Sequence, residues 1–163
     1  MGDLLSLAAR VEKLTGPSKE VDRAVARVVG WFRVEPRHSR NRYGGWIAPD
    51  DFLGADSDGR PILDSLHGTT IWRDPPSWTA SVDAVLALIE RELPGCGPGF
   101  SQNSGLAGKA GACHASIDQS EEDWTYEGWP SVKAATPALA LLSAALRAKA
   151  AQQQMEADRG EDI

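Results

Sequence analysis

The sequence predicts an α+β fold, with a single domain over residues 1–151 in which helices cover a small antiparallel sheet, and a polar tail over residues 152–163. Three observations lead to this prediction. Four segments combine apolar residues at helical spacing with helix-capping residues. The segments between them are rich in turn residues and contain only short β-branched or aromatic runs. The order helix, helix, strands, helix, strands, helix favours an α+β layer over a doubly wound parallel sheet.

Two helices are expected within the first 30 residues. Asp3 can cap the first helix, and Gly16-Pro17 stops it, since proline cannot continue a helix. Its apolar stripe consists of Leu4, Leu7, Val11 and Leu14. Ser18 starts the second helix and Gly30 ends it. The stripe of this second helix consists of Val21, Val25, Val28 and Val29.

The region from residue 31 to residue 80 predicts short strands separated by turns. Extended segments are expected at residues 31–34, 44–48 and 69–72, because these are aromatic or β-branched. A basic loop over residues 37–42 separates the first two. The stretches 49–51, 55–61 and 74–77 are rich in proline, aspartate, serine and glycine, which are turn-forming residues.

A third helix follows, capped by Ser81 and ended by Pro94-Gly95. Its apolar face consists of Val82, Val85, Leu86, Ile89 and Leu93. Residues 95–111 contain six glycines and predict a long turn or a flexible hairpin. Strands are expected at residues 112–117 and 124–126, on either side of an acidic turn at residues 121–123.

The last helix has the clearest start signal. Thr136 is a good N-cap, and Pro137 occupies the first helical position, where its missing N–H has no cost. The apolar face consists of Leu139, Leu142 and Leu146. Arg147 and Lys149 are expected in the late turns, where positive charge favours the helix dipole. From residue 152 the chain is polar and is expected to be a disordered, solubilising tail.

The overall composition limits the classes of function. The net charge of −6 and the isoelectric point near 5.0 disfavour broad binding to nucleic acid or to anionic membranes. The apolar runs are far shorter than a membrane span, and the N-terminus has no signal-peptide features. Two cysteines, Cys96 and Cys113, do not make a disulfide framework. These features predict a soluble cytoplasmic protein; its oligomeric state stays open.

Three segments together resemble a known family. They are residues 14–22 (LTGPSKEVD), 78–85 (WTASVDAV) and 134–140 (AATPALA). In this order they resemble the phage ABA sandwich domain family, although the middle segment has Trp78 and Val82 where the family usually has another aromatic residue and leucine. Residues 36–76 and 95–120 do not match. The resemblance implies an α/β/α sandwich and a phage or prophage origin, and it brings no established activity and no catalytic residues.

One local charge cluster is the candidate binding site. Four arginines between residues 33 and 42 have His38, Tyr43 and Trp46 nearby, and arginine forks bind phosphate or carboxylate in a bidentate manner. The predicted ligand- or partner-binding residues are Arg37, Arg40, Arg42, Tyr43 and Trp46. The alternative is a solvated loop, neutralised by Asp50, Asp51, Asp56 and Asp58.

Two motifs fail on their spacing. Asp56-x-Asp58-Gly59 followed by Asp64 resembles part of a calcium loop, but it lacks the third ligand before the glycine and the glutamate at position twelve. The segment Gly105–Ala110 contains Gly108-Lys109 but has Asn103 and Ala110 where a phosphate loop needs glycine and serine or threonine. A turn and a mobile loop are the preferred interpretations.

Cysteine and histidine chemistry is the remaining option. Cys113 and His114 are neighbours in a predicted strand, so their side chains point to opposite faces and cannot form a dyad together. Cys113 could pair with His38 or His67 across the fold, although a structural cysteine is the default. No paired spacing indicates a zinc site. We therefore assign no catalytic residues, no metal and no cofactor from the sequence.

The sequence predicts a phage- or prophage-derived accessory protein that acts by binding a host protein or a small anionic ligand, with interference in host defence as one version. An enzyme is the less favoured reading. It would be a small hydrolase or transferase that uses Cys113, a histidine and an aspartate from distant segments. A structural virion-associated protein is the third alternative.

Overall fold

The computed structural model describes residues 2–34, 45–55, 61–63, 74–102, 113–118 and 132–160. The chain forms two compact units, and the second is inserted into the first. Unit 1 consists of Met1–Asp22 and Ser77–Ile163, and unit 2 consists of Arg23–Pro76. The helices are α1 (Gly2–Glu12), α2 (Lys19–Val28), α3 (Val82–Glu92) and α4 (Pro137–Gly160), with a short 3-10 helix η1 (Pro49–Asp51). The strands are β1 (Phe32–Val34), β2 (Gly45–Ile47), β3 (Phe52–Ala55), β4 (Pro61–Leu63), β5 (Gly97–Gln102), β6 (Cys113–Asp118) and β7 (Val132–Ala134).

Three of the four described α-helices begin at their predicted capping residues. α1 begins at Gly2, so Asp3, its predicted cap, lies within the first helical turn. The Ser81 side chain accepts a hydrogen bond from the Ala84 N–H at 3.2 Å at the start of α3. Thr136 accepts from the Leu139 N–H at 3.3 Å at the start of α4. Ser18 accepts from the Val21 N–H at 3.3 Å at the start of α2. Each cap is set by residues within one turn, which explains why local sequence was sufficient to find it.

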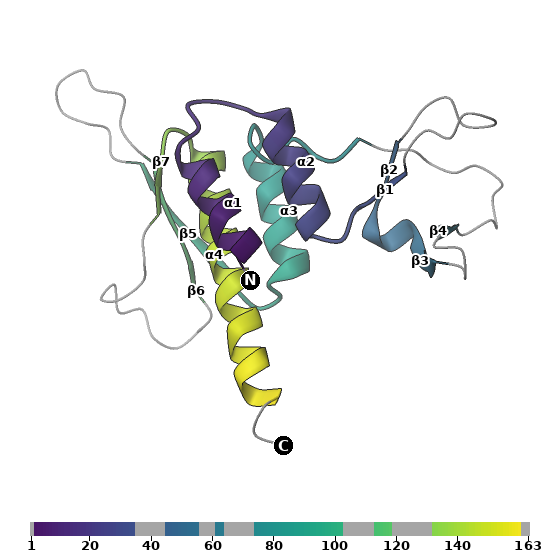
Figure 1. Cartoon of the computed structure of the whole chain (residues 1–163). Coiled ribbons are helices and arrows are strands. Elements are labelled where there is room, and N and C mark those ends of the chain that lie inside the picture. The colour runs from purple at the N-terminus through teal and green to yellow at the C-terminus, as the bar shows by residue number, and fades with distance from the viewer. Residues whose placement is uncertain are drawn as a thin grey trace. The chain divides into compact units, whose positions relative to one another are not determined.

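The core of unit 1 lies between α1, α3, α4 and the sheet. α4 supplies most of it, because one face contacts α1 and α3 while another contacts β6 and β7. Its N-terminal half is therefore buried all round, and the fully buried side chains of this core include Val11, Val85, Leu139, Leu142 and Leu146. The last turns of α4 extend past the other helices of this unit (Figure 1) and are almost entirely exposed.

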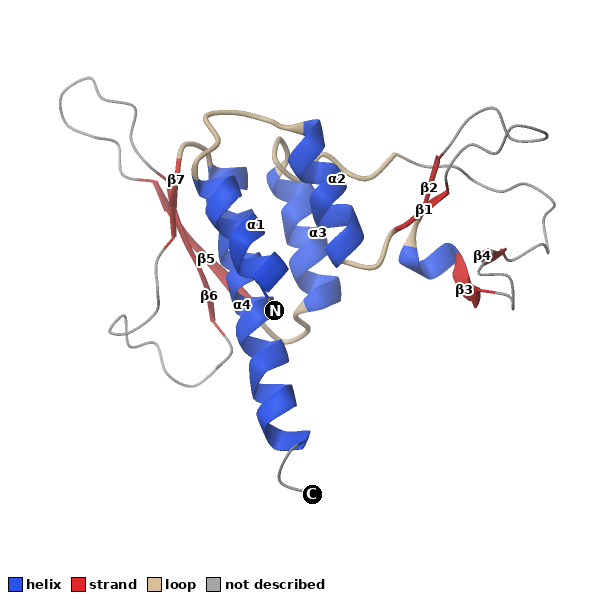
Figure 2. Cartoon of the chain, viewed as in Figure 1, coloured by secondary structure: helices blue, strands red, loops and turns tan. Residues whose placement is uncertain are grey.

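The sheet of unit 1 has the strand order β5-β6-β7, and both pairs are antiparallel. β5 and β6 pair from Gly97↔Asp118 to Gln102↔Cys113, and β6 and β7 pair from Cys113↔Ala134 to Ala115↔Val132. In Figure 2, α1, α3 and α4 lie on one side of this sheet. The predicted α+β class, with a small antiparallel sheet covered by helices, is confirmed. A helical layer on the other face is not among the described residues, so the three-layer sandwich stays a prediction.

Unit 2 begins with the second half of α2 and contains two small antiparallel ladders. β1 pairs with β2, with Arg33 opposite Trp46, and β3 pairs with β4 through a bulge. Its buried apolar residues include Val25, Ala26, Trp31, Trp46 and Ile47. The extended segments predicted at residues 31–34 and 44–48 are β1 and β2. The segment predicted at residues 69–72 lies outside the described residues.

Several expectations differ from the structure. Residues 95–111 are expected to form a long turn or a flexible hairpin, and in their described part residues 97–102 form β5, which pairs with β6. The partners that β6 supplies for backbone hydrogen bonds offset the low strand propensity of Gly97, Pro98 and Gly99. β3 and β4 form in and beside a segment expected to consist of turns. The expected boundary at residue 151 falls inside α4, whose alanine, glutamine, glutamate and methionine residues are strong helix formers through Gly160. The single domain expected over residues 1–151 is organised as two units.

Candidate functional site

The predicted binding residues lie mostly outside the described part of the chain. Arg37, Arg40, Arg42 and Tyr43 belong to residues 35–44, which the structure does not describe. Trp46 is described: it occupies the middle of β2 and is 5% exposed. Its indole is therefore packed inside unit 2 and does not form an open platform for a ligand.

A tight helix end sets the geometry around Trp46. α2 ends before Gly30, which has a φ of 82° and so adopts the left-handed conformation that favours glycine. The Trp31 N–H donates to the Ala26 carbonyl at 2.8 Å, which is the bond expected of a Schellman helix end. The chain then turns directly into β1 at Phe32. The last turn of α2 and the first strand are thereby connected by one short turn.

Two guanidinium groups lie over the Trp46 ring. Arg27, in the last turn of α2, has its Cζ 5.7 Å from the ring centroid. Arg33, the cross-strand neighbour of Trp46 in β1, has its Cζ at the same distance of 5.7 Å. Both arginines are exposed residues, and each contact of this kind is worth about 0.5–1 kcal/mol at such a site. Trp46 thus acts as the support on which two surface arginines are placed.

Such cation–π contacts are compatible with anion binding. Carboxylates and phosphates are bound by the N–H groups along the edge of a guanidinium, whereas a cation–π contact uses its positive charge. Residues 23–46 contain six arginines and one acidic residue, Glu35, in a chain whose net charge is −6. We call Arg27, Arg33 and Trp46 the arginine–tryptophan site. It places positive charge locally on an acidic protein.

Arg27 is the functional candidate that the sequence analysis missed. It sits on the charged outer face of an amphipathic helix, where an arginine has no distinguishing feature. The available signal was Gly30, because a glycine-terminated helix followed at once by a strand brings the last helical turn close to that strand. Arg33 was recognised as part of the basic cluster, but its pairing with Trp46 depends on strand register.

A second polar cluster lies within unit 1, and we call it the Asp22 cluster: Ser18, Asp22, Trp78 and Thr79. The Thr79 N–H donates to Asp22 Oδ1 at 2.8 Å, and its hydroxyl donates to Asp22 Oδ2 at 3.1 Å. The Thr79 Oγ1 accepts from the Ser18 N–H at 2.8 Å. Asp22 is 5% exposed and Thr79 is 1% exposed. This cluster joins two of the three segments that carry the family resemblance, and it does so through structural hydrogen bonds.

Burial dominates the titration of Asp22. Loss of hydration raises the pKa of this carboxyl above its ordinary value of 3.8, while the hydrogen bonds from Thr79 and from the Trp78 backbone act in the opposite direction. The charged form is therefore disfavoured in the folded protein. A carboxylate that is buried and fully hydrogen-bonded fits an architectural role better than a solvent-facing reactive one.

Arg147 and Lys149 lie in the middle of α4, so the expected interaction with the helix dipole does not apply to them. Arg147 donates from Nε and Nη2 to Glu12 Oε1, each at 2.8 Å. The buried Ser143 hydroxyl donates to the same oxygen at 2.7 Å. These contacts connect α4 to α1.

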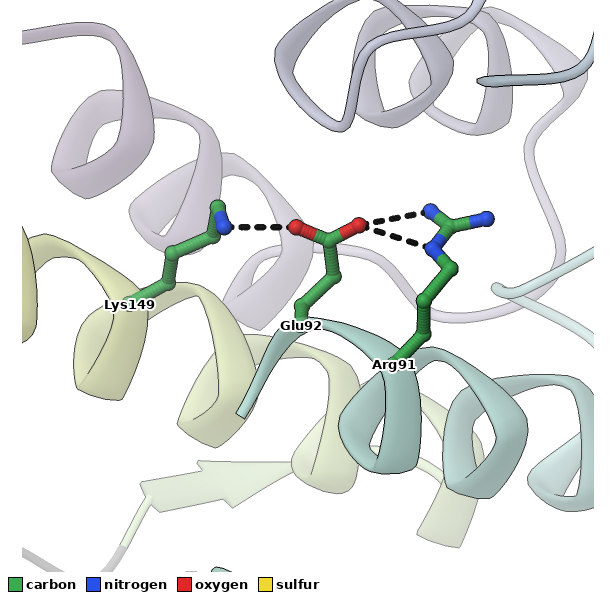
Figure 3. Close-up of polar contacts among 3 residues, drawn as sticks. All are labelled: Arg91, Glu92 and Lys149. Atoms are coloured by element: carbon green, nitrogen blue, oxygen red, sulfur yellow. Dashed lines mark hydrogen bonds and ion pairs between the residues drawn. The ribbon is translucent and has the colours of Figure 1, made fainter. Parts of the chain in front are cut away.

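Lys149 connects α4 to α3 in a similar way. Its Nζ lies 2.5 Å from Glu92 Oε2, and Arg91 donates to the other carboxylate oxygen from Nε and Nη2, each at 2.8 Å (Figure 3). The carboxylate of Glu92 lies between the two cations. Both oxygens are thereby engaged, so this cluster stabilises helix packing and does not present a site to a ligand.

The remaining motifs contribute no described site. The Asp56–Asp64 and Gly105–Ala110 motifs, His38 and His67 lie entirely or almost entirely outside the described residues. Cys113 and His114 are consecutive residues of β6. Neighbouring positions of a strand face opposite sides of the sheet, which disfavours a dyad between these two residues. Within the described ranges, no three histidine, cysteine, aspartate or glutamate residues cluster as metal ligands would.

Comparisons with protein-family models, curated proteins and solved structures find no match to this chain. The resemblance to the phage ABA sandwich domain family therefore stays a prediction that depends on three sequence segments. None of the helices described here combines the length and the apolar character needed to cross a bilayer.

Proposed function

We propose that this protein acts by binding an anionic partner through the arginine–tryptophan site and the basic segment over residues 37–42. The observation that carries the proposal is that Arg27 and Arg33 both lie on Trp46, in the same unit as Arg37, Arg40 and Arg42. An arginine already held in place by a cation–π contact loses less side-chain entropy when an anion binds to it. The partner is an acidic surface of a host protein or a small anionic ligand.

The accessory role and the phage or prophage origin belong to the same proposal and are supported by the three resembling segments. Unit 1 contributes helices, caps and ion pairs that hold a scaffold, whereas unit 2 carries the concentrated arginines. Such an arrangement is typical of proteins in which a stable scaffold positions a separate binding segment. The net charge of −6 also supports local recognition of an anion over general attraction to polyanions.

The test compares two double variants of equal charge. Arg27→Gln with Arg33→Gln removes the site, while Arg10→Gln with Arg91→Gln removes two arginines of unit 1 that pair with Glu20 and Glu92. Affinity for pyrophosphate and for a polyglutamate peptide is measured by calorimetry with the full chain. The first variant is expected to bind at least about tenfold more weakly, since hydrogen bonds to charged groups are worth about 1.5–3 kcal/mol. The control is expected to bind like the wild type.

The two probes separate a small ligand from a protein surface. Preference for pyrophosphate favours a small phosphate-bearing ligand, and preference for the peptide favours an acidic protein. Replacing Arg40 and Arg42 by glutamine is expected to abolish binding without lowering thermal stability. Equal affinity in all variants, or an equal loss in the Arg10 and Arg91 control, would refute the proposed site.

A further inference from the structure

The Asp22 cluster lies where the chain leaves unit 1 and returns to it. Unit 2 begins at Arg23, immediately after Asp22, and ends at Pro76, shortly before Thr79. All four residues of the cluster belong to unit 1. The hydrogen bonds between Asp22 and Thr79 therefore join two segments whose partners are 57 residues apart in sequence.

The cluster is protected from water. Asp22, Trp78 and Thr79 are 5%, 2% and 1% exposed, respectively. Hydrogen bonds in such surroundings are not replaced by water, so breaking one leaves a buried polar group without a partner. The two chain segments that connect unit 1 to unit 2 are thus joined by hydrogen bonds whose loss would lower the stability of the fold.

The first turn of α2 has its own bonds inside unit 1. The Asp22 N–H donates to the Ser18 carbonyl at 2.9 Å, and the Val21 N–H donates to the Ser18 side chain at 3.3 Å. The unit boundary follows directly after this turn, within α2. The second half of the helix can therefore unwind without loss of the bonds that fix its beginning.

Unit 1 also has a core of its own. Val11 of α1, Val85 of α3 and Leu142 of α4 are 0% exposed, and these helices and the sheet pack on one another. We infer that the Asp22 cluster keeps unit 1 folded while the described part of unit 2, which includes residues 23–34 and 45–55, opens and refolds separately. Proteins commonly open locally in contiguous cooperative units of this kind.

Hydrogen exchange at increasing urea concentration, read by mass spectrometry on the full chain, tests the inference. Amides of α1 and α4 are expected to stay protected at urea concentrations where amides of residues 23–29 and 46–48 already exchange. Thr79→Val removes the hydroxyl bonds and is expected to lower protection in α1 and α3 about tenfold or more, which brings the two units closer together in stability. Thr79→Ser keeps the hydroxyl and is expected to restore the separation.

Two further variants make the test specific. Arg10→Gln removes an exposed ion pair of unit 1 without touching Asp22, and it is expected to keep the separation between the units because exposed pairs contribute little to stability. Asp22→Ala, which removes both acceptor oxygens, provides a second disruption of the cluster. Loss of protection in both units at one urea concentration in the wild type would overturn the inference. So would an unchanged separation in both Thr79→Val and Asp22→Ala.

Discussion

Asp22 makes the stability of this protein depend on pH in a direction opposite to that of an ordinary salt-bridged aspartate. Burial raises the pKa of its carboxyl above 3.8, so the folded state binds more protons than the unfolded state at pH values just above 3.8. The contribution of Asp22 to stability is therefore fully present below pH 3.8. It is lost as the pH rises through the raised pKa of the folded state.

Replacing Asp22 by asparagine isolates this contribution. The amide keeps an oxygen that can accept from the Thr79 N–H, and its nitrogen can donate to the Thr79 hydroxyl oxygen. That hydroxyl can in turn donate to the Ser18 carbonyl, which lies 3.5 Å away. Because the shape is preserved and the charge is removed, the variant is expected to lose the pH dependence while keeping the fold.

The magnitude follows from proton linkage. One proton gives a slope of at most about 1.4 kcal/mol per pH unit in the unfolding free energy. We subtract the unfolding free energy of Asp22→Asn from that of the wild type. This difference is expected to fall as the pH rises above about 3.8, by no more than this slope, and to level off above the raised pKa. By contrast, Asp22→Ala leaves the buried N–H groups of Thr79 and Trp78 without an acceptor, which costs roughly 2–6 kcal/mol at 1–3 kcal/mol each.

The assay is equilibrium unfolding in urea, followed by circular dichroism, at a series of pH values from 3.5 to 8. Each titration curve gives a midpoint and a free energy of unfolding. Other titrating groups cancel when the variant is subtracted from the wild type. A difference that stays constant with pH, or one in which the wild type gains stability relative to the variant as the pH rises, would refute the reasoning about burial.

Three further predictions concern the frame of the molecule. Leu142→Ala is expected to lower the unfolding free energy by about 2–5 kcal/mol in urea titrations, because Leu142 is 0% exposed; a loss below about 1 kcal/mol would contradict its place in the core. Gly30→Ala is expected to lower the unfolding free energy by about 1 kcal/mol, because alanine is strained at the φ of 82°. A steric clash adds nothing to this cost, since the added Cβ would lie at an ordinary 3.7 Å from Pro49 Cγ. Removing residues 152–163 is expected to reduce the helical circular dichroism signal and leave the urea midpoint unchanged, because this end of α4 is almost entirely exposed; a clear shift of the midpoint would show that it packs on the protein.

The ion pairs of α4 illustrate how sequence reasoning can place a helix and still misjudge its charges. Arg147 and Lys149 look like residues of a last turn, but the helix continues to Gly160, and the two cations pair with Glu12 and Glu92. These pairs are partly exposed, so each contributes modestly to stability. Their positions on α4 help to set which neighbours the helix contacts.

The sequence by itself determined the four α-helices and the starts of α2, α3 and α4. Ser81 and Thr136 act as caps through bonds to residues three positions away, and Gly30 ends α2 through its own backbone conformation. Such signals need no distant part of the chain. The α+β class follows from the same local information, because helices and short strands alternate in a recognisable order.

Only the tertiary structure decided the formation of β5, the pairing register of the strands and the two polar sites. β5 forms in a segment of low strand propensity because β6 provides partners for its backbone, and strand register places Arg33 opposite Trp46. Asp22 is an ordinary surface-type residue in the sequence, and it becomes a buried acceptor only when Thr79 reaches it from 57 positions away. Contacts of this kind depend on packing between distant segments, for which a single sequence carries no local signal.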